Sequence, residues 1–445
     1  MKKILILFLV FALMGGTIAS ILVFAGIGPG SSTKTDPFAD VPAPVIRSLR
    51  YADFRGQDVA SLDLSRSGDI FPTFTFDSKT VWPEADKMPS AVSPQKIMEQ
   101  GKYLGLGLSA LHREGLTGKG ISVAVIDKPI LPDHVEFSGN MTYIEVKPDH
   151  PNAKQVHFHG AAVASILAGK HGVAPGARLY YFAVPDDADP YARYTEAMMK
   201  LLEYQKTLPE REKIRVVVVS HGIEPEALAQ NEGGARDWAQ AIEKARGEGI
   251  IVVYPGMNEI NFTGTGALPG KDRDDPSSYE LWTWTKAKKE VAQKLKDSGV
   301  NSWDAAREEL KKFLTDYPEL DALTAEAAHT FIYFSTAYRN EVPFSVWLES
   351  VLGEPGKTLA VPADYLTVAD VRAKDAYAYY GSGGLSWAAP YLAGLMALGF
   401  QAKPGATQDE ILKALWDSST PFSGEARLVN PRGFIGALGG NLTGK

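Results

Sequence analysis

The chain contains no cysteine among its 445 residues. It therefore cannot form a disulfide framework, a thiolate metal site or a cysteine nucleophile. It also lacks a block of basic residues, and its formal net charge is −7, which argues against nucleic acid as a partner. Since 45% of the residues are hydrophobic and only 22% are charged, the chain can bury the core of one large domain or of two.

Charge is also missing near the N-terminus, where Lys2 and Lys3 precede the uncharged segment Ile4–Gly26. This segment is long enough to span a bilayer as a helix, and the two lysines favour the cytoplasmic side for its start. Val23 and Ala25 equally fit the −3 and −1 positions of a signal-peptidase site. Residues 1–26 are thus predicted to be a signal peptide or a membrane anchor. Either predicts a protein that is secreted or anchored on the outer face of the cytoplasmic membrane.

The region that follows has no clear pattern of its own. Residues 27–45 are rich in Gly, Ser, Pro and Asp and read as a linker. Residues 46–100 form an N-terminal extension, in which the phrase Ser48–Phe54 is echoed by Ser61–Ser65. Two such units cannot bury a face alone, so we expect a strand pair packed on the next domain.

From residue 101 to residue 445 the chain reads as one α/β domain. Apolar runs typical of buried strands alternate with helical stretches, which predicts a three-layer domain with a mainly parallel sheet. The expected strands are Ile121–Ile126, Arg178–Val184, Ile214–Val219, Ile250–Tyr254 and Thr358–Val361, and the expected helices lie near 160–169, 192–206, 232–248 and 387–400.

A long stretch at about 272–353 interrupts this alternation. It contains two helical-looking pieces, near 280–297 and 302–315, with interspersed charges. One interpretation is an inserted helical subdomain that covers its own apolar face. The other is a lid or exosite above a cleft, because loops at strand ends carry function. We expect an insertion near the cleft and assign it no role.

Three polar residues stand at positions suited to acyl transfer. Asp127 ends the apolar run Gly120–Asp127, and His159 opens a helix of small residues that ends at Gly169. Ser386 lies directly before a buried helix, and we expect Pro390 in the first turn of that helix. An Asp, a His and a Ser at strand ends and helix starts can act as orienter, base and nucleophile.

These three segments, in this order, resemble the motifs of the subtilisin-like serine proteases (subtilases). The resemblance covers roughly residues 101–400 and rests on Val123–Asp127 with His134, on His159-Gly160-x-x-Val163-Ala164, and on Gly384-x-Ser386-x-Ala388-x-Pro390. It implies a subtilisin-like fold and a triad of Asp127, His159 and Ser386. The chain departs from the family pattern at Lys128-Pro129, Ala161-Ala162 and Leu385.

The resemblance also implies an oxyanion donor and a substrate-binding segment. Asn258 is the implied donor, although Met257 separates it from Gly256 where the family has glycine directly before asparagine. Asn261 is the nearest substitute. Ser220-His221-Gly222 resembles the segment that pairs with the substrate backbone. His221 replaces an apolar residue, so it either makes the pocket polar and pH-sensitive or simply faces solvent.

No cofactor is expected, and no metal site is assigned. An acidic turn at Asp186, Asp187 and Asp189 is a candidate cation site, but such turns are usually just solvated. Calcium is compatible with this reading, and the sequence assigns no residues to it.

The sequence thus predicts an exported serine endopeptidase whose partner is a peptide or protein substrate, with the membrane as a further partner where residues 1–26 remain uncleaved. Two alternatives stay open: a weak or inactive subtilase fold that binds peptides or proteins at the cell surface, and an esterase or amidase that acts on other acyl groups.

Overall fold

The computed structural model describes residue 38 and residues 40–137, 139–186, 189–222, 232–257, 259–337 and 342–440. The predicted signal peptide or anchor at 1–26 lies outside this set, as does most of the predicted linker. No helix within the described ranges is both long enough and apolar enough to cross a membrane.

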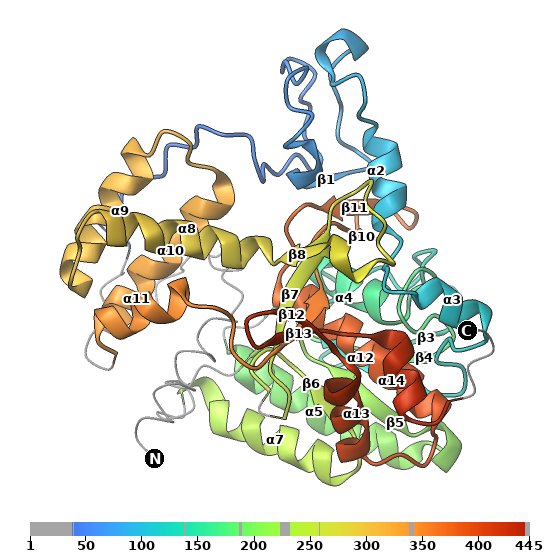
Figure 1. Ribbon diagram of the computed structural model, residues 1–445. Coiled ribbons are helices and arrows are strands. Elements are labelled where there is room, and N and C mark those ends of the chain that lie inside the picture. Colours follow the sequence, from blue (N-terminus) through green and yellow to red (C-terminus); the bar gives the residue numbers. More distant parts are fainter. Residues whose placement is uncertain are drawn as a thin grey trace.

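A five-stranded parallel sheet forms the centre of the molecule (Figure 1). Every residue of the strand that ends at Asp127 is buried, as expected for a strand covered on both faces. The strands lie in the order β3 (Met141–Glu145), β4 (Arg178–Ala183), β2 (Ser122–Asp127), β5 (Ile214–Val218) and β6 (Ile251–Val253).

Helices cover both faces of this sheet, so the predicted three-layer α/β fold is confirmed. Helix α4 (Phe158–Ala168) packs on α12 (Leu385–Ala402), and α5 (Pro190–Thr207) packs on α7 (Ala235–Gly247). Helix α12 is buried along nearly its whole length, which explains its apolar sequence. The C-terminal helices α13 (Gln408–Ser418) and α14 (Pro431–Ala437) pack against each other and against α12.

Two further sheets flank the central one. The predicted strand Thr358–Val361 forms as β9, one residue later and in the first of these sheets. The strands of that sheet lie in the order β12 (Thr420–Ser423), β13 (Ala426–Leu428), β9 (Leu359–Pro362), β7 (Phe262–Ala267) and β8 (Tyr279–Leu281). The strands of the other sheet lie in the order β1 (Phe76–Asp77), β11 (Tyr377–Tyr380) and β10 (Leu366–Ala369).

The described residues of the inserted region contain four α-helices, which project away from the sheets (Figure 1). They are α8 (Thr283–Asp297), α9 (Trp303–Asp316), α10 (Ala322–Ala337) and α11 (Phe344–Leu352). Their apolar faces form a core of their own, separate from that of the α/β domain. The structure therefore shows a subdomain that covers its own apolar surface.

The N-terminal extension is built differently from the expected strand pair, and that prediction was wrong. It contains mostly turns, the short helix α2 (Pro94–Gly101) and the two-residue strand β1, which pairs with β11 of the α/β domain. A cluster of aromatic side chains provides its packing instead, and it includes Phe71, Phe74, Phe76 and the α/β-domain residues Tyr365 and Tyr379.

The other short helices of the described residues are α3 (Leu108–Arg113), η2 (Phe71–Thr73), η3 (Ala85–Lys87), η4 (Glu210–Glu212), η5 (Glu232–Gly234) and η6 (Pro276–Ser278).

The start of the described chain lies on the inserted subdomain. Asp40 forms ion pairs with Arg307 and Lys311 of α9, and the backbone N–H of Val45 donates to the carbonyl of Leu314 at 2.8 Å. The blue segment in Figure 1 then runs from the inserted helices to β1. The extension thus contacts both the inserted subdomain and the α/β domain.

Candidate active site

The end of strand β2 and the start of helix α4 bring Asp127 and His159 together. Asp127 is the last residue of β2, and His159 lies in the first turn of α4, whose N-cap is His157. The Nδ1 atom of His159 is 2.8 Å and 3.0 Å from the two carboxylate oxygens of Asp127. A carboxylate bonded to Nδ1 fixes the imidazole so that Nε2 can act as a base.

The buried carboxyl of Asp127 is held in its ionised form. Burial by itself raises its pKa, because it removes water from the charge. The charge and hydrogen bond of His159, together with the backbone N–H of Lys128 at 2.7 Å, outweigh this effect and lower the pKa of Asp127. An anion is therefore in place to stabilise an imidazolium at His159.

Ser386 lies in the first turn of α12, whose N-cap is Gly384. The ring of Trp387, the next residue, meets the His159 ring edge to face at a centroid distance of 5.7 Å. The Ser386 side chain is buried, and its Oγ makes no hydrogen bond with any residue that the structure describes. Hydrogen bonds between catalytic groups are often longer without substrate and tighten in the complex. Of the three residues predicted as a triad, the structure joins Asp127 and His159 by hydrogen bonds, and it links Ser386 to them through the contact of its neighbour Trp387 with His159.

The position of Pro390 differs from the prediction. Helix α12 begins at Leu385, so Pro390 lies inside the helix rather than in its first turn. Because proline has no N–H, it leaves the carbonyl of Ser386 without its usual intrahelical donor. The hydroxyl of Ser220 donates to that carbonyl at 3.3 Å. Ser220, predicted as a substrate-binding residue, therefore contacts the main chain of Ser386, the predicted nucleophile.

The segment Ser220-His221-Gly222 continues from β5, beside the turn that follows β6. His221 stacks on Tyr194 at a ring-centroid distance of 4.8 Å and does not simply face solvent, which excludes that alternative. Its Nε2 is buried and has no hydrogen-bond partner among the described residues. Burial, followed by the charge of Arg193, lowers the pKa of His221 to about 4.

The predicted oxyanion donor Asn258 lies outside the described residues, but the turn before it is described. The extra residue Met257 points into the core and is only 3% exposed. Gly256 has φ +85°, a left-handed conformation that other residues rarely adopt. Asn261, the predicted substitute, directly precedes β7, and its carbonyl accepts from the N–H of Leu359 at 2.9 Å.

The unusual Lys128 after the aspartate has a structural explanation. Its ammonium pairs with Asp186 at 2.9 Å, and Asp186 also pairs with Arg193 at 2.8 Å. Asp189 caps α5 by accepting from the N–H of Ala192, and Asp187 lies outside the described residues. Within the described part of the chain, no group of three or more histidines and acids has the arrangement of a metal site.

A family model, described as the subtilase family, matches residues 118–434. This range contains all three predicted triad residues and most of the chain.

The chain belongs to the subtilase family.

Solved structures offer only distant likenesses. The prenylagaramide maturation protease PagA is 16% identical with a TM-score of 0.43, over 75% of this chain and 98% of that one. Fervidolysin, a keratinolytic enzyme from Fervidobacterium pennivorans, is 16% identical with a TM-score of 0.45, over 78% and 48%. The A-subunit of the AB5 toxin from E. coli is 15% identical with a TM-score of 0.42, over 76% and 99%. None of the curated proteins matches the chain.

This subtilase has an aromatic cluster beside its histidine that the sequence motifs do not indicate. Phe158, Tyr380 and Trp387 lie around His159, with ring centroids 5.1 Å apart between Tyr380 and Trp387. Arg55 of the N-terminal extension lies over the rings of Phe158 and Tyr380, at 4.8 Å and 4.9 Å. The extension therefore contributes a side chain to the aromatic cluster that adjoins His159. Arg55 and the rings that it contacts are far apart along the chain, so no local motif could have indicated this contact.

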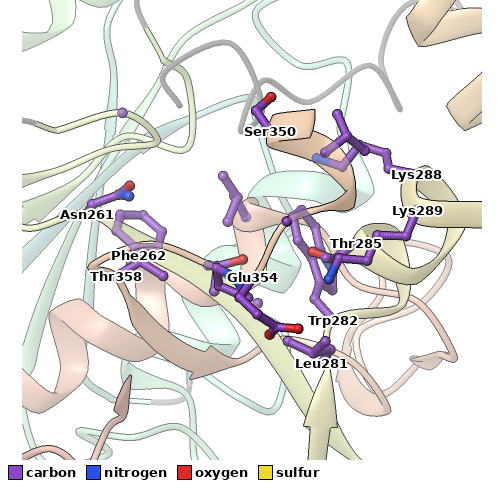
Figure 2. A pocket seen from close by; sticks show the side chains of 17 residues that line it. Asn261, Phe262, Leu281, Trp282, Thr285, Lys288, Lys289, Ser350, Glu354 and Thr358 are labelled. Carbon is purple, nitrogen blue, oxygen red and sulfur yellow. The ribbon is translucent and has the colours of Figure 1, made fainter. Parts of the chain in front are cut away.

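A pocket of about 100 Å³ lies between the inserted subdomain and the α/β domain of this subtilase (Figure 2). Gly256 and Leu385, the residue before Ser386, lie in its wall, so it adjoins both the start of α12 and the turn that leads to Asn258. Lys288 and Lys289 of α8 line it from the inserted side. Burial lowers the pKa of Lys288 to about 7. The sequence predicts an insertion near the cleft, and this pocket lies where the inserted subdomain meets the α/β domain.

Proposed function

We propose that the chain is an exported serine endopeptidase that cleaves peptide bonds through Asp127, His159 and Ser386. The observation that carries the proposal is the double contact of His159 Nδ1 with the ionised, buried Asp127, next to the helix start that bears Ser386. Membership of the subtilase family supports it, because the matched range contains all three of these residues.

The proposed reaction follows from the roles these groups can take. Ser386 Oγ attacks the peptide carbonyl, and His159 Nε2 accepts the proton that the hydroxyl loses. Asp127 stabilises the imidazolium, which then protonates the leaving amine. The first N–H groups of α12 lack intrahelical acceptors and favour negative charge at the helix start, so they support the developing oxyanion. Water then hydrolyses the acyl-enzyme by the same proton transfers in reverse order.

A fluorophosphonate probe tests this assignment directly. The probe should label the wild type, and it should label neither Ser386→Ala nor, at a comparable rate, His159→Ala, because triad members act as a unit. Ser165→Ala is a matched control, since Ser165 is also a buried helical serine but lies inside α4. Equal labelling of wild type and Ser386→Ala would refute the assignment.

Export is tested separately with a reporter fused after residue 60. The reporter should cross the bacterial membrane, and N-terminal sequencing then distinguishes the two predictions for residues 1–26. A start near Ile27 indicates a cleaved signal peptide, whereas an intact terminus in the membrane fraction indicates an anchor. A reporter that stays in the cytosol would contradict export.

One observation favours a second candidate, a subtilase fold that binds peptides without cleaving them. Ser386 Oγ is buried without a hydrogen bond to any described residue, and Leu385 replaces the usual threonine before it. A wild type that binds peptides but never reacts with the probe would support this candidate. A labelled protein that cleaves esters or small amides but no peptide would indicate the remaining alternative, an esterase or amidase.

A further inference from the structure

The short segment Gly381–Gly384 connects β11 to α12 and presents Ser386. Both main-chain groups of Gly383 in this segment are hydrogen-bonded to side chains. Its N–H donates to Asp364 Oδ1 at 2.8 Å, and its carbonyl accepts from the indole Nε1 of Trp282 at 2.7 Å. The backbone just before the nucleophile is therefore fixed by side chains from two other parts of the chain.

The inserted subdomain supplies one of these parts. Trp282 is the N-cap residue of α8, and Thr283 is its first residue. The N–H of Thr283 donates to Asp364 Oδ2 at 2.9 Å, and its hydroxyl lies 2.7 Å from that of Ser382. A single carboxylate, Asp364, thus accepts from the first turn of the inserted helix and from the segment that carries the serine.

These contacts are shielded from water. Thr283 and Asp364 are each 1% exposed, and Trp282 is 6% exposed. Hydrogen bonds in such surroundings are stronger than at the surface, and breaking one leaves a buried polar group unsatisfied. The connection between α8 and Gly383 is therefore rigid.

The opposite side of the segment is held by the N-terminal extension. A Cβ atom at Gly381 would lie only 2.0 Å from the carbonyl oxygen of Thr73. The segment is thus confined between the extension and the inserted subdomain, and it has little room to shift.

We propose that the inserted subdomain positions the nucleophile: Trp282 and the Thr283–Asp364 pair hold Gly383, and through it the backbone that presents Ser386. Trp282 and Asp364 are positioning residues, since neither contacts the reacting atoms. A small displacement of a reacting group lowers the rate strongly, so loosening Gly383 should slow the attack by Ser386. The role of Ser386 rests on the proposed function, whereas the restraint on Gly383 does not.

Two tryptophans allow a matched test. Trp282→Phe removes the indole N–H but keeps an aromatic ring against β7. Trp303→Phe is the control, because Trp303 is also 6% exposed and also donates at 2.7 Å to a carbonyl, that of Val342 inside the inserted subdomain. For each variant we would measure the rate of fluorophosphonate labelling, the thermal midpoint, and hydrogen exchange in peptides covering residues 377–387.

Trp282→Phe should slow labelling by a few-fold to about tenfold, as expected for one buried hydrogen bond, and should speed exchange in 377–387. Trp303→Phe should lower the thermal midpoint similarly and change neither of the other two measurements. Equal effects of both variants on labelling and exchange, or no effect of Trp282→Phe on either, would overturn the inference. If the wild type is not labelled, the proposed function fails, and the exchange comparison alone decides the inference.

A second pair guards against a variant that does not fold. Thr283→Val removes the hydroxyl at nearly constant volume, and Thr283→Ser retains it. Labelling should slow in the valine variant and recover in the serine variant. Equal labelling rates in the two variants would count against a role for this hydroxyl.

Discussion

The Ser220 hydroxyl donates a hydrogen bond to the main-chain carbonyl of Ser386 at 3.3 Å. Pro390 creates the need for this bond, because it has no N–H to offer the carbonyl four residues before it. Two residues remote in sequence are therefore linked at the nucleophile: one follows the central strand β5, and the other opens α12.

Removing this donor should affect turnover more than substrate binding. In Ser220→Ala the carbonyl of Ser386 stays buried without its partner, and we expect kcat to fall roughly tenfold at most, with little change in KM. Ser220→Thr keeps the hydroxyl and should retain most of the activity. Steady-state kinetics on a peptide substrate measures both, and an unchanged kcat in Ser220→Ala would show that the bond is dispensable.

Asn258 is expected to donate its side-chain amide to the oxyanion. Asn258→Ala should lower turnover about 10²–10³-fold with little change in substrate affinity, as the loss of one such donor does. Asn261→Ala is the matched comparison, since Asn261 is the nearest alternative oxyanion donor in the sequence. An equal loss in Asn261→Ala alone, or normal turnover in Asn258→Ala, would remove Asn258 from the site.

His221 should make the protein less stable in acid. Its folded pKa of about 4 lies below the ordinary value of 6.5, so between these values the unfolded chain binds more protons than the folded one. The free energy of unfolding should therefore rise with pH from about 4 to 6.5, with His221 contributing on the order of 3 kcal/mol. His221→Phe keeps a ring on Tyr194 but does not titrate. Urea unfolding at several pH values should give a flatter profile for this variant, and parallel profiles would contradict the prediction.

The N-terminal extension should remain in the mature protein. Its aromatic cluster includes Tyr365 and Tyr379 of the catalytic domain, so removing it would expose their apolar surface. N-terminal sequencing of exported protein should find a start before residue 46. Phe71→Ala, at a fully buried position, should lower the free energy of unfolding by about 3–5 kcal/mol. A stable mature form that starts near residue 100 would instead identify a removable propeptide.

The pocket beside Leu385 predicts a preference for acidic substrate groups. Lys288 and Lys289 line it, while Glu354, the acid in its wall, accepts a hydrogen bond from Ser423. Peptide libraries that differ only in Glu or Gln at one position near the cleaved bond should be cut faster with Glu. Lys289→Glu should reverse this preference, and Lys294→Glu at the other end of α8 should not. Equal cleavage of both libraries by the wild type would exclude an acidic subsite.

The sequence predicted the parts of this protein that depend on local pattern. The run that ends at Asp127 is nearly unbroken in its apolar character, and the structure buries its residues Ser122–Asp127 in the central sheet. The small residues after His159 likewise form a fully packed helix. In both cases a short motif contains the whole physical cause of the local structure.

The contacts that the sequence did not reveal are those made between distant segments. Arg55 lies over Phe158, and Trp282 donates to Gly383, yet each pair is about 100 positions apart along the chain. Nothing in the composition near Ser48 distinguishes a strand pair from turns held by aromatic packing. The predicted position of Pro390 in the first helical turn was wrong, because helix α12 starts earlier than the apolar pattern indicates.

The attachment of the first described residues to the inserted subdomain sets a limit on reach. Phe38 packs against His329 of α10 at a ring-centroid distance of 5.9 Å, and it lies twelve positions after residue 26. Fully extended, twelve residues span at most about 40 Å. If residues 1–26 stay in the bilayer, the inserted helices that bind the start of the described chain would therefore be held within this distance of the membrane. The substrates of such an enzyme would be proteins embedded in, or lying against, the same membrane, where confinement to a thin layer raises their effective concentration.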